Sequence, residues 1–216
     1  MSASVRKKAF VITAGPTREH LDPVRFLSNP STGKMGFAVA RAAAARGHRV
    51  TLVAGPVSLR TPRGVRRIDV TSARDMLAAV ERALTEAGPG AAFVATAAVA
   101  DWRPADCAVR KLKKREMDGV IRLVRNPDIL KSVAASVKIG FAAETGDALA
   151  EAARKCREKS LDMIVANDVT EKGAGFGTDT NRVAFLRRDG TVEKLPLMTK
   201  LAIARRIVRF CEDIRP

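Results

Sequence analysis

Short apolar runs recur along the chain and are separated by stretches with helical spacing. Each run is apolar without alternation and rich in β-branched residues, which is typical of strands covered on both faces. Strands are therefore expected at 9–13, 49–53, 65–70, 92–96, 137–142 and 162–166. Because strands that alternate with helices build parallel sheets, the pattern predicts an α/β fold with a mainly parallel six-stranded sheet.

Capping signals place helices between these strands. An alanine-rich stretch at 36–46 is followed by Gly47, a typical C-terminal cap, and Ser72 with Asp75 has the spacing of a capping box. A last helix is expected at 199–214. Its inward-facing residues are expected to be Leu201, Ile203, Ile207, Val208 and Cys211.

Six parallel strands joined by right-handed crossovers predict the doubly wound, Rossmann-like order. In that order the first and fourth strands lie side by side, the winding reverses between them, and a ligand crevice opens at their carboxyl ends. A C-terminal β-hairpin is expected within about 170–197, because Asp189 and Gly190 form a strong two-residue turn signal.

Two insertions border the predicted crevice. The segment 15–34 places about twenty mostly polar residues where a strand-to-helix loop usually has about 2–6. The second insertion, at about 106–125, is basic, and Gly119 is expected to turn it as a hairpin flap. Long loops at such positions are frequently functional.

The composition fits one globular domain that spans 1–216, since 216 residues are too few for two ordinary cores. Three cysteines without a C-x-x-C pair argue against a disulfide framework, and two histidines leave little for metal clusters or hydrolase triads. No apolar run is long enough for a membrane helix and no signal peptide is recognisable. We therefore expect a cytoplasmic protein without a membrane partner.

The end of the first insertion carries groups that suit phosphate. Hydroxyls, main-chain N–H groups and a lysine come together just before a helix: Ser28, Ser31, Thr32, Gly33 and Lys34. Such groups at a helix N-terminus bind phosphate, although an ordinary N-cap cluster has the same appearance. The segment is not a P-loop, because Ser28 stands in place of its first glycine.

The segment after the fourth strand is a second candidate. Its small residues at 97–100 allow close approach of a flat base or a pantetheine-like arm, and Asp101 follows them. Asp101 is a candidate for holding Mg²⁺ or a ligand group, or for capping a turn. Lys111 then opens the run K-L-K-K at 111–114, which suits either a cationic flap or a solvated face.

Two later segments carry weaker signals. The tripeptide Asn126-Pro127-Asp128 is a helix start whose N–H groups suit either a ribose or simple capping. Lys155 and Lys159 lie four apart on a predicted helix, where they face a polyphosphate or solvent. The run G-A-G-F-G at 173–177 lacks the spacing of a dinucleotide fingerprint.

Taken together, these motifs resemble those of the phosphopantothenate–cysteine ligase family, in its bacterial form that uses cytidine triphosphate (CTP). The resemblance rests on ordered blocks such as I-T-A-G-P-T-R-E at 12–19, D-P-V-R at 22–25 and K-L-K-K at 111–114. The remaining blocks lie at 28–29, 33–36, 97–101, 126–128, 140–145 and 166–168.

The resemblance implies a ligase of coenzyme A biosynthesis that joins 4′-phosphopantothenate to L-cysteine. The pantothenate carboxylate would attack the α-phosphate of CTP, Mg²⁺ would assist, and the cysteine amine would displace CMP from the acyl-cytidylate. Asn29 corresponds to the residue that acts on this intermediate, and Lys111 to the essential flap lysine. Further CTP contacts correspond to Ala95, Thr96, Ala97, Asp101, Asn126, Pro127, Asp128, Ile129, Phe141, Lys155 and Lys159.

The resemblance also implies partners. Relatives form homodimers, and the hairpin at 182–195 offers an edge for a second copy. A flavin-dependent decarboxylase, fused or separate, is the expected neighbour in the reaction sequence.

Two other functions remain as alternatives. The net charge of +16 suits a nucleic-acid-binding module, although aromatic residues make up only 4% of the chain, which is poor for base stacking. A nicotinamide-dependent reductase fits the fold, but the chain has no tyrosine and no glycine fingerprint. No nucleic-acid partner is therefore expected.

Overall fold

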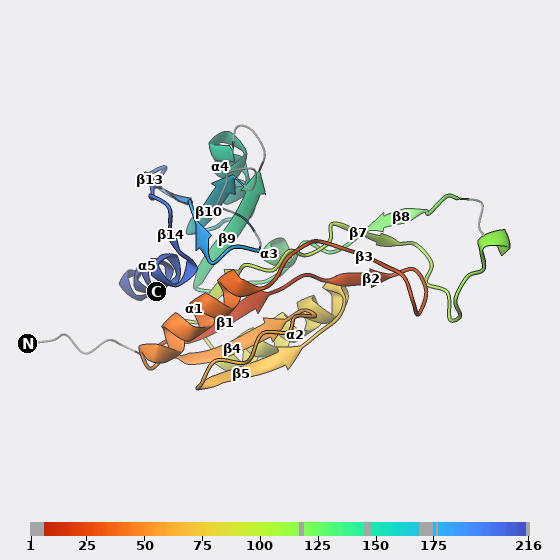
Figure 1. Cartoon of the computed structure of the whole chain (residues 1–216). Helices are drawn as coiled ribbons and strands as arrows, with labels where there is room; N and C mark the ends of the chain where they lie inside the picture. Colours follow the sequence, from red (N-terminus) through yellow and green to blue (C-terminus); the bar gives the residue numbers. More distant parts are fainter. Residues whose placement is uncertain (1–6, 117–118, 145–147, 169–174, 176, 215–216) are drawn as a thin grey trace, which may run out of the picture.

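The structure is a computed structural model that describes residues 7–116, 119–144, 148–168, 175 and 177–214. Eight strands form one sheet in the order β13-β12-β10-β9-β6-β1-β4-β5 (Figure 1). Its six parallel strands are β1 (Ala9–Ala14), β4 (Arg49–Ala54), β5 (Val65–Asp69), β6 (Ala92–Ala95), β9 (Val137–Glu144) and β10 (Met163–Asp168). The predicted doubly wound order is confirmed, with β1 and β6 adjacent.

The C-terminal hairpin adds two strands to the six that were predicted for the sheet. Its strands β12 (Ala184–Arg187) and β13 (Val192–Lys194) are antiparallel and continue the same sheet, which has eight strands in place of six. The reason is that β10 would otherwise be an open edge, and β12 supplies hydrogen-bonding partners for it. Residues 170–174 and 176 of the predicted hairpin region lie outside the described residues.

Helices cover both faces of the sheet because successive strand residues point to opposite sides. On β1, Phe10 and Ile12 belong to a core shared with α1 (Lys34–Ala45) and α5 (Lys200–Asp213). The intervening Val11 packs in a second core with α2 (Ala73–Ala87) and α3 (Ile129–Ser132). A third cluster lies under α4 (Ala148–Glu158).

Local capping agrees with the sequence signals. Ser72 Oγ accepts the N–H of Asp75 at 3.1 Å, and Asp75 Oδ2 accepts the N–H of Ser72 at 2.9 Å, so the predicted capping box is confirmed. The helix predicted after 126–128 is a single turn, capped by Asp128. In the part of the chain that the structure describes, no helix is both long and apolar enough to cross a membrane.

The two insertions form an arm that projects from one side of the sheet (Figure 1). Segment 15–34 is a hairpin of β2 (Arg18–His20) and β3 (Phe26–Ser28), not an irregular loop. The flap is framed by β7 (Trp102–Pro104) and β8 (Leu123–Arg125), with a 3₁₀ turn at Lys114–Glu116. A short pair, β11 (Thr180–Asn181) with β14 (Met198–Thr199), leads into α5.

Candidate active site

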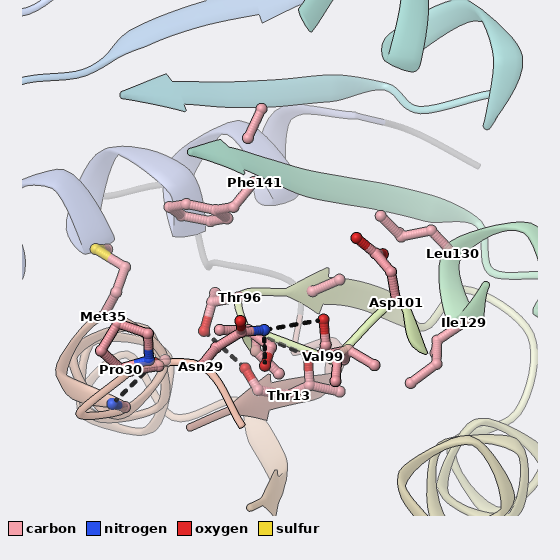
Figure 2. Close-up of a pocket in the computed structure, with 18 of the residues that line it drawn as sticks. Thr13, Asn29, Pro30, Met35, Thr96, Val99, Asp101, Ile129, Leu130 and Phe141 are labelled. Carbon is pink, nitrogen blue, oxygen red and sulfur yellow. Dashed lines mark hydrogen bonds between the residues drawn. The ribbon is translucent and has the colours of Figure 1, made fainter. Parts of the chain in front are cut away.

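A cavity of about 720 Å³ opens at the carboxyl ends of β1, β6 and β9, where the winding of the sheet reverses. Its walls come from the start of α1, the segment after β6, the α3 turn, α4 and the start of α5. Figure 2 shows Asn29, Thr96 and Asp101 along this cavity with Phe141 facing them. The crevice expected between the first and fourth strands is present.

A close approach between α1 and the ends of β1 and β6 fixes the cavity floor. Thr96 Oγ1 donates to the carbonyl of Thr13 at 2.7 Å, and the N–H of Ala97 donates to Thr13 Oγ1 at 3.3 Å. Gly36 packs against this joint, where an added Cβ would lie 2.5 Å from Thr96 Oγ1 and from Ala14 Cβ. A side chain at this position would therefore push α1 away from the sheet.

Asn29 connects the first insertion to the segment after β6. Its Nδ2 donates to the carbonyl oxygens of Ala98 and Val99 at 3.2 and 3.3 Å (Figure 2). Both carbonyls accept hydrogen bonds from the amide nitrogen, and no donor to the side-chain oxygen Oδ1 is found among the described residues, so this oxygen is available to a ligand. Asn29 is a cavity residue, as predicted.

The start of α1 presents main-chain N–H groups without a side-chain cap. Gly33 has φ 77°, a left-handed conformation that favours glycine, and it is followed at once by Lys34. No acidic residue lies in the first turn of α1, and the nearby carboxylate of Asp179 pairs with Lys34 Nζ at 2.8 Å. This end of the cavity suits an anion, as the sequence indicated.

Asn126 fixes the cavity wall that is formed by the end of the segment after β6. Its Nδ2 donates to the carbonyl of Ala100 at 2.8 Å and its N–H donates to the carbonyl of Asp101 at 2.8 Å. Arg103 donates to Asn126 Oδ1 at 3.2 Å. These bonds keep the exposed carboxylate of Asp101 at the cavity edge.

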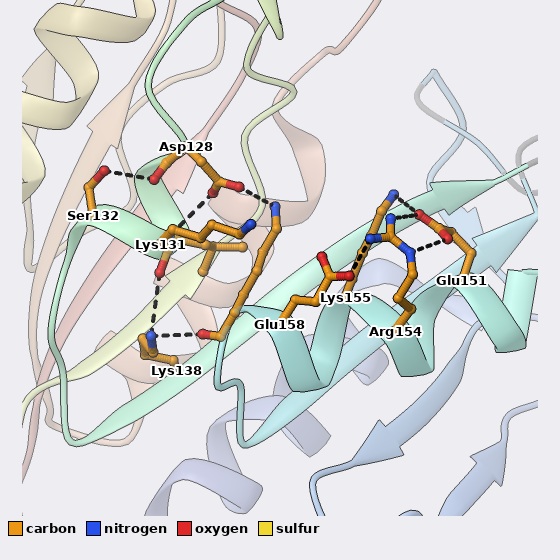
Figure 3. Close-up of polar contacts among 10 residues, drawn as sticks. Asp128, Lys131, Ser132, Lys138, Glu151, Arg154, Lys155 and Glu158 are labelled. Atoms are coloured by element: carbon orange, nitrogen blue, oxygen red, sulfur yellow. Dashed lines mark hydrogen bonds and ion pairs between the residues drawn. The ribbon is translucent and has the colours of Figure 1, made fainter.

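Two lysines from the α4 region, Lys155 and Lys159, also line the cavity. Figure 3 shows Lys155 beside Glu151 and Arg154. Lys159 Nζ pairs with Asp128 at 2.9 Å, and Lys155 Nζ lies 3.5 Å from Glu151. Arg154 binds Glu151 and Glu158, and its hydrogen bond is the main cause that lowers the pKa of Glu151 to about 2. Both lysines therefore carry carboxylate partners and also line the cavity.

The cavity includes residues that sequence reasoning did not select. Lys200 is buried and donates to the carbonyls of Gly175 and Thr178 at 2.8 and 2.6 Å. Burial lowers the pKa of Lys200 to about 8, and the charge of Lys34 adds to this effect. The buried Asn181 Oδ1 lacks a hydrogen-bond partner in the described structure. Helical periodicity reports which residues are buried but not that a buried lysine faces a cavity.

The structure brings together most of the predicted site residues. Those that line the cavity are Asn29, Ser31, Thr32, Gly33, Lys34, Ala95, Thr96, Ala97, Asp101, Asn126, Pro127, Asp128, Ile129, Phe141, Lys155 and Lys159. Two predicted residues do not line it. Ser28 instead donates to the carbonyl of Thr17 at 2.7 Å, and Lys111 is an exposed flap residue. No cluster of three potential metal ligands occurs among the described residues.

The sheet order and the position of the cavity define a Rossmann-like, doubly wound α/β protein. The family model for the DNA/pantothenate metabolism flavoprotein C-terminal domain matches residues 5–214, and the chain belongs to this family. The Vibrio cholerae coenzyme A biosynthesis bifunctional protein CoaBC is 48% identical over 213 residues, which are 95% of this chain and 52% of the relative. The chain thus spans about half the length of the curated relatives it matches.

Solved structures agree with this assignment. The crystal structure of the C-terminal domain of a coenzyme A biosynthesis bifunctional protein CoaBC has a TM-score of 0.80 and 42% identity, covering 98% of this chain and 97% of that one. A Cab2 mutant in complex with phosphopantothenate-cysteine has a TM-score of 0.77 at 16% identity, covering 96% of this chain and 87% of that one. The second likeness concerns the fold alone.

Proposed function

We propose that this chain is a phosphopantothenate–cysteine ligase that uses CTP. The observation that carries the proposal is the shared cavity, in which Asn29, Asp101, Lys155, Lys159 and the open end of α1 converge. Supporting it, the relatives named for coenzyme A biosynthesis align with nearly all of the chain, and a protein of the same fold was solved with phosphopantothenate-cysteine.

The proposed reaction has two steps. The carboxylate of 4′-phosphopantothenate attacks the α-phosphate of CTP and pyrophosphate leaves; the cysteine amine then attacks the acyl carbon and CMP leaves. Both steps develop negative charge on oxygen, which ammonium groups and main-chain N–H groups stabilise. The α1 terminus, Lys155 and Lys159 supply such groups, and Asn29 is proposed to hold the acyl-cytidylate.

Asp101 is proposed to hold Mg²⁺ together with the nucleotide. Magnesium is usually bound by one or two carboxylates plus substrate phosphates, so a single exposed carboxylate at the cavity edge fits this role. When bound, the ion neutralises charge on the triphosphate oxygens.

Lys111 is proposed as the flap lysine that meets the reacting phosphates. Because it does not line the cavity of its own chain, the role requires either movement of the flap or a second copy that supplies the lysine. Mixing Asn29→Asp subunits with Lys111→Gln subunits separates these cases. Activity returns on mixing only if one copy contributes Lys111 to the cavity of the other.

We further propose a homodimer and a decarboxylase neighbour. The β13 edge remains available for pairing, and large apolar side chains are exposed on the arm, among them Val24, Phe26, Val109, Val120 and Leu123. Exposed apolar side chains on one part of the molecule favour contact with another copy. Sedimentation velocity measures the mass, and a monomer at micromolar concentration contradicts the dimer.

The ligase proposal is tested by incubating the protein with 4′-phosphopantothenate, CTP, Mg²⁺ and L-cysteine. Pyrophosphate release should require phosphopantothenate, and CMP release should require cysteine as well. ATP in place of CTP tests the base preference. If neither pyrophosphate nor CMP appears while the protein is folded, the proposal is wrong.

A further inference from the structure

The turn of the β2–β3 hairpin contains an ion pair outside the cavity, in which the carboxylate is buried and the arginine side chain is 39% exposed. Asp22 has no exposed side-chain surface, and its Oδ2 accepts Arg25 Nε at 2.9 Å and a terminal guanidinium nitrogen of Arg25 at 2.5 Å. Its Oδ1 accepts the N–H groups of Val24 and Arg25, both at 2.8 Å. Neither Asp22 nor Arg25 lines the cavity.

This ion pair also holds the flap. The N–H of Leu112 donates to Asp22 Oδ2 at 3.2 Å, and Arg25 donates to the carbonyl of Leu112 at 3.1 Å. The N–H and the carbonyl of Leu112 are therefore both bound by the Asp22–Arg25 pair. A further bond joins the N–H of Ala108 to the carbonyl of Leu21 at 2.9 Å. Lys111 lies between these two attachment points.

The carboxylate of Asp22 stays ionised at neutral pH. Hydrogen bonds from Arg25 are the main cause that lowers its pKa far below the usual range, and three main-chain N–H groups add to the effect. A buried carboxylate is costly unless every oxygen is satisfied, and here one of its donors comes from the flap 90 residues away. The hairpin itself supplies the other donors to this carboxylate, and the flap adds the N–H of Leu112 to them.

We propose that Asp22, together with Arg25, is a positioning residue for Lys111. The pair fixes the main chain at Leu112 and so sets the place from which the neighbouring ammonium group reaches the reacting phosphates. The inference rests on the proposed function, and in particular on the role given there to Lys111.

The test is a double-mutant cycle on pyrophosphate release. Asp22→Asn keeps the size of the side chain, removes its charge and places an NH₂ group against the donors. We expect kcat for pyrophosphate release to fall at least tenfold in Asp22→Asn, with a smaller change in KM for CTP. In a Lys111→Gln background the same substitution should cause no further loss, because residues that act as a unit are non-additive.

A matched control is present on the same flap. Asp106 pairs with Arg122 at 3.1 Å, but both side chains are more than 80% exposed. Exposed pairs contribute little, so Asp106→Asn should leave pyrophosphate release unchanged. Equal losses in Asp22→Asn and Asp106→Asn would overturn the assignment.

A second variant guards against misfolding of Asp22→Asn. Arg25→Lys keeps a positive charge but lacks the planar group that reaches Asp22 and the Leu112 carbonyl together. It should show the same non-additivity with Lys111→Gln and faster trypsin cleavage of the folded protein near Lys113 and Lys114. Losses that multiply in the double variant, or wild-type rates in both single variants, would refute the inference.

The outcomes also separate the inference from the proposed function. If the wild-type protein releases no pyrophosphate, the proposed function fails and this inference with it. If the wild type is active and Lys111→Gln is impaired while Asp22→Asn and Arg25→Lys are not, only the positioning role is wrong.

Discussion

The side-chain amide of Asn29 donates to the main-chain carbonyl of Ala98 at 3.2 Å, across 69 residues of sequence. The bond ties the segment that precedes α1 to the segment that follows β6, the two sides of the point where the winding reverses. A residue that joins both sides is well placed to contact a ligand that spans them. Substitutions at Asn29 therefore test the site more directly than substitutions at its rim.

Asn29→Asp should leave pyrophosphate release near the wild-type rate and slow cysteine-dependent CMP release about 100-fold, the order of loss expected when one positioned polar contact to a transition state is lost. The carboxylate would face the carbonyls of Ala98 and Val99 and be repelled, so it cannot hold the intermediate as the amide does. Rapid-quench measurement of both products separates the steps. Wild-type CMP release would remove Asn29 from the mechanism.

Gly36→Ala should lower the free energy of unfolding by about 1–3 kcal/mol, as expected for overpacking. An exposed helical glycine would instead gain up to about 1 kcal/mol from the same change. Here the new Cβ would meet Ala14 Cβ and Thr96 Oγ1 at 2.5 Å. Urea unfolding measures the change. Gly177→Ala is the control, since no atom of the described residues lies within 4 Å of its added Cβ, and an equal loss there would contradict the steric argument.

Lys200 should make the free energy of unfolding increase with pH in the alkaline range. Its folded-state pKa is lowered to about 8 from 10.5, so above pH 8 the unfolded chain binds more protons than the folded one, and stability should rise up to about pH 10.5. Relative to Lys200→Met, the free energy of unfolding of the wild type should increase by on the order of 3 kcal/mol between pH 8 and pH 10.5. Urea unfolding of both proteins from pH 7 to 10.5 measures the difference, and a constant difference would show that burial does not govern this lysine.

Glu212 should stabilise the contact between α5 and the loop after α1. It accepts two hydrogen bonds from Arg46, at 2.6 and 2.7 Å, and one from His48 at 2.7 Å. Burial opposes its ionisation, but the bonds from Arg46 and His48 outweigh that effect and lower the pKa of Glu212. The stabilisation is therefore present above the ordinary pKa of 4.5 and is lost as pH falls through the lower folded-state value.

Glu212→Gln should lower the free energy of unfolding by about 1–3 kcal/mol at pH 7, the range for a lost hydrogen bond to a charged group, and by less at pH 3. Urea unfolding at both pH values measures this. Glu193→Gln is the matched control, because Glu193 pairs with Arg206 at 2.8 Å while 38% exposed, and such pairs contribute less than about 1 kcal/mol. A loss at Glu193 as large as that at Glu212 would contradict the role of burial.

Much of the fold followed from local signals. The six apolar runs became parallel strands in the predicted order, and Ser72 with Asp75 capped α2 as expected. Local signals did not predict the length of α3 or the pairing of β12 with β10. A helix-start signal contains no information on where the helix ends, and hydrogen bonding between a hairpin and a sheet edge depends on pairing partners far apart in sequence.

The sequence by itself determined the layers and the positions of the strands, because apolar periodicity and capping are properties of neighbouring residues. The strand order followed from the rule for doubly wound sheets, and most of the cavity residues followed from the resemblance to the ligase family. The tertiary structure decided which polar groups meet. It brought Lys200 to the cavity, kept Lys111 out of the cavity lining and bound the flap to Asp22. The contact between Asp22 and Leu112 joins residues 90 positions apart, and its energy depends on burial and geometry that no local pattern records.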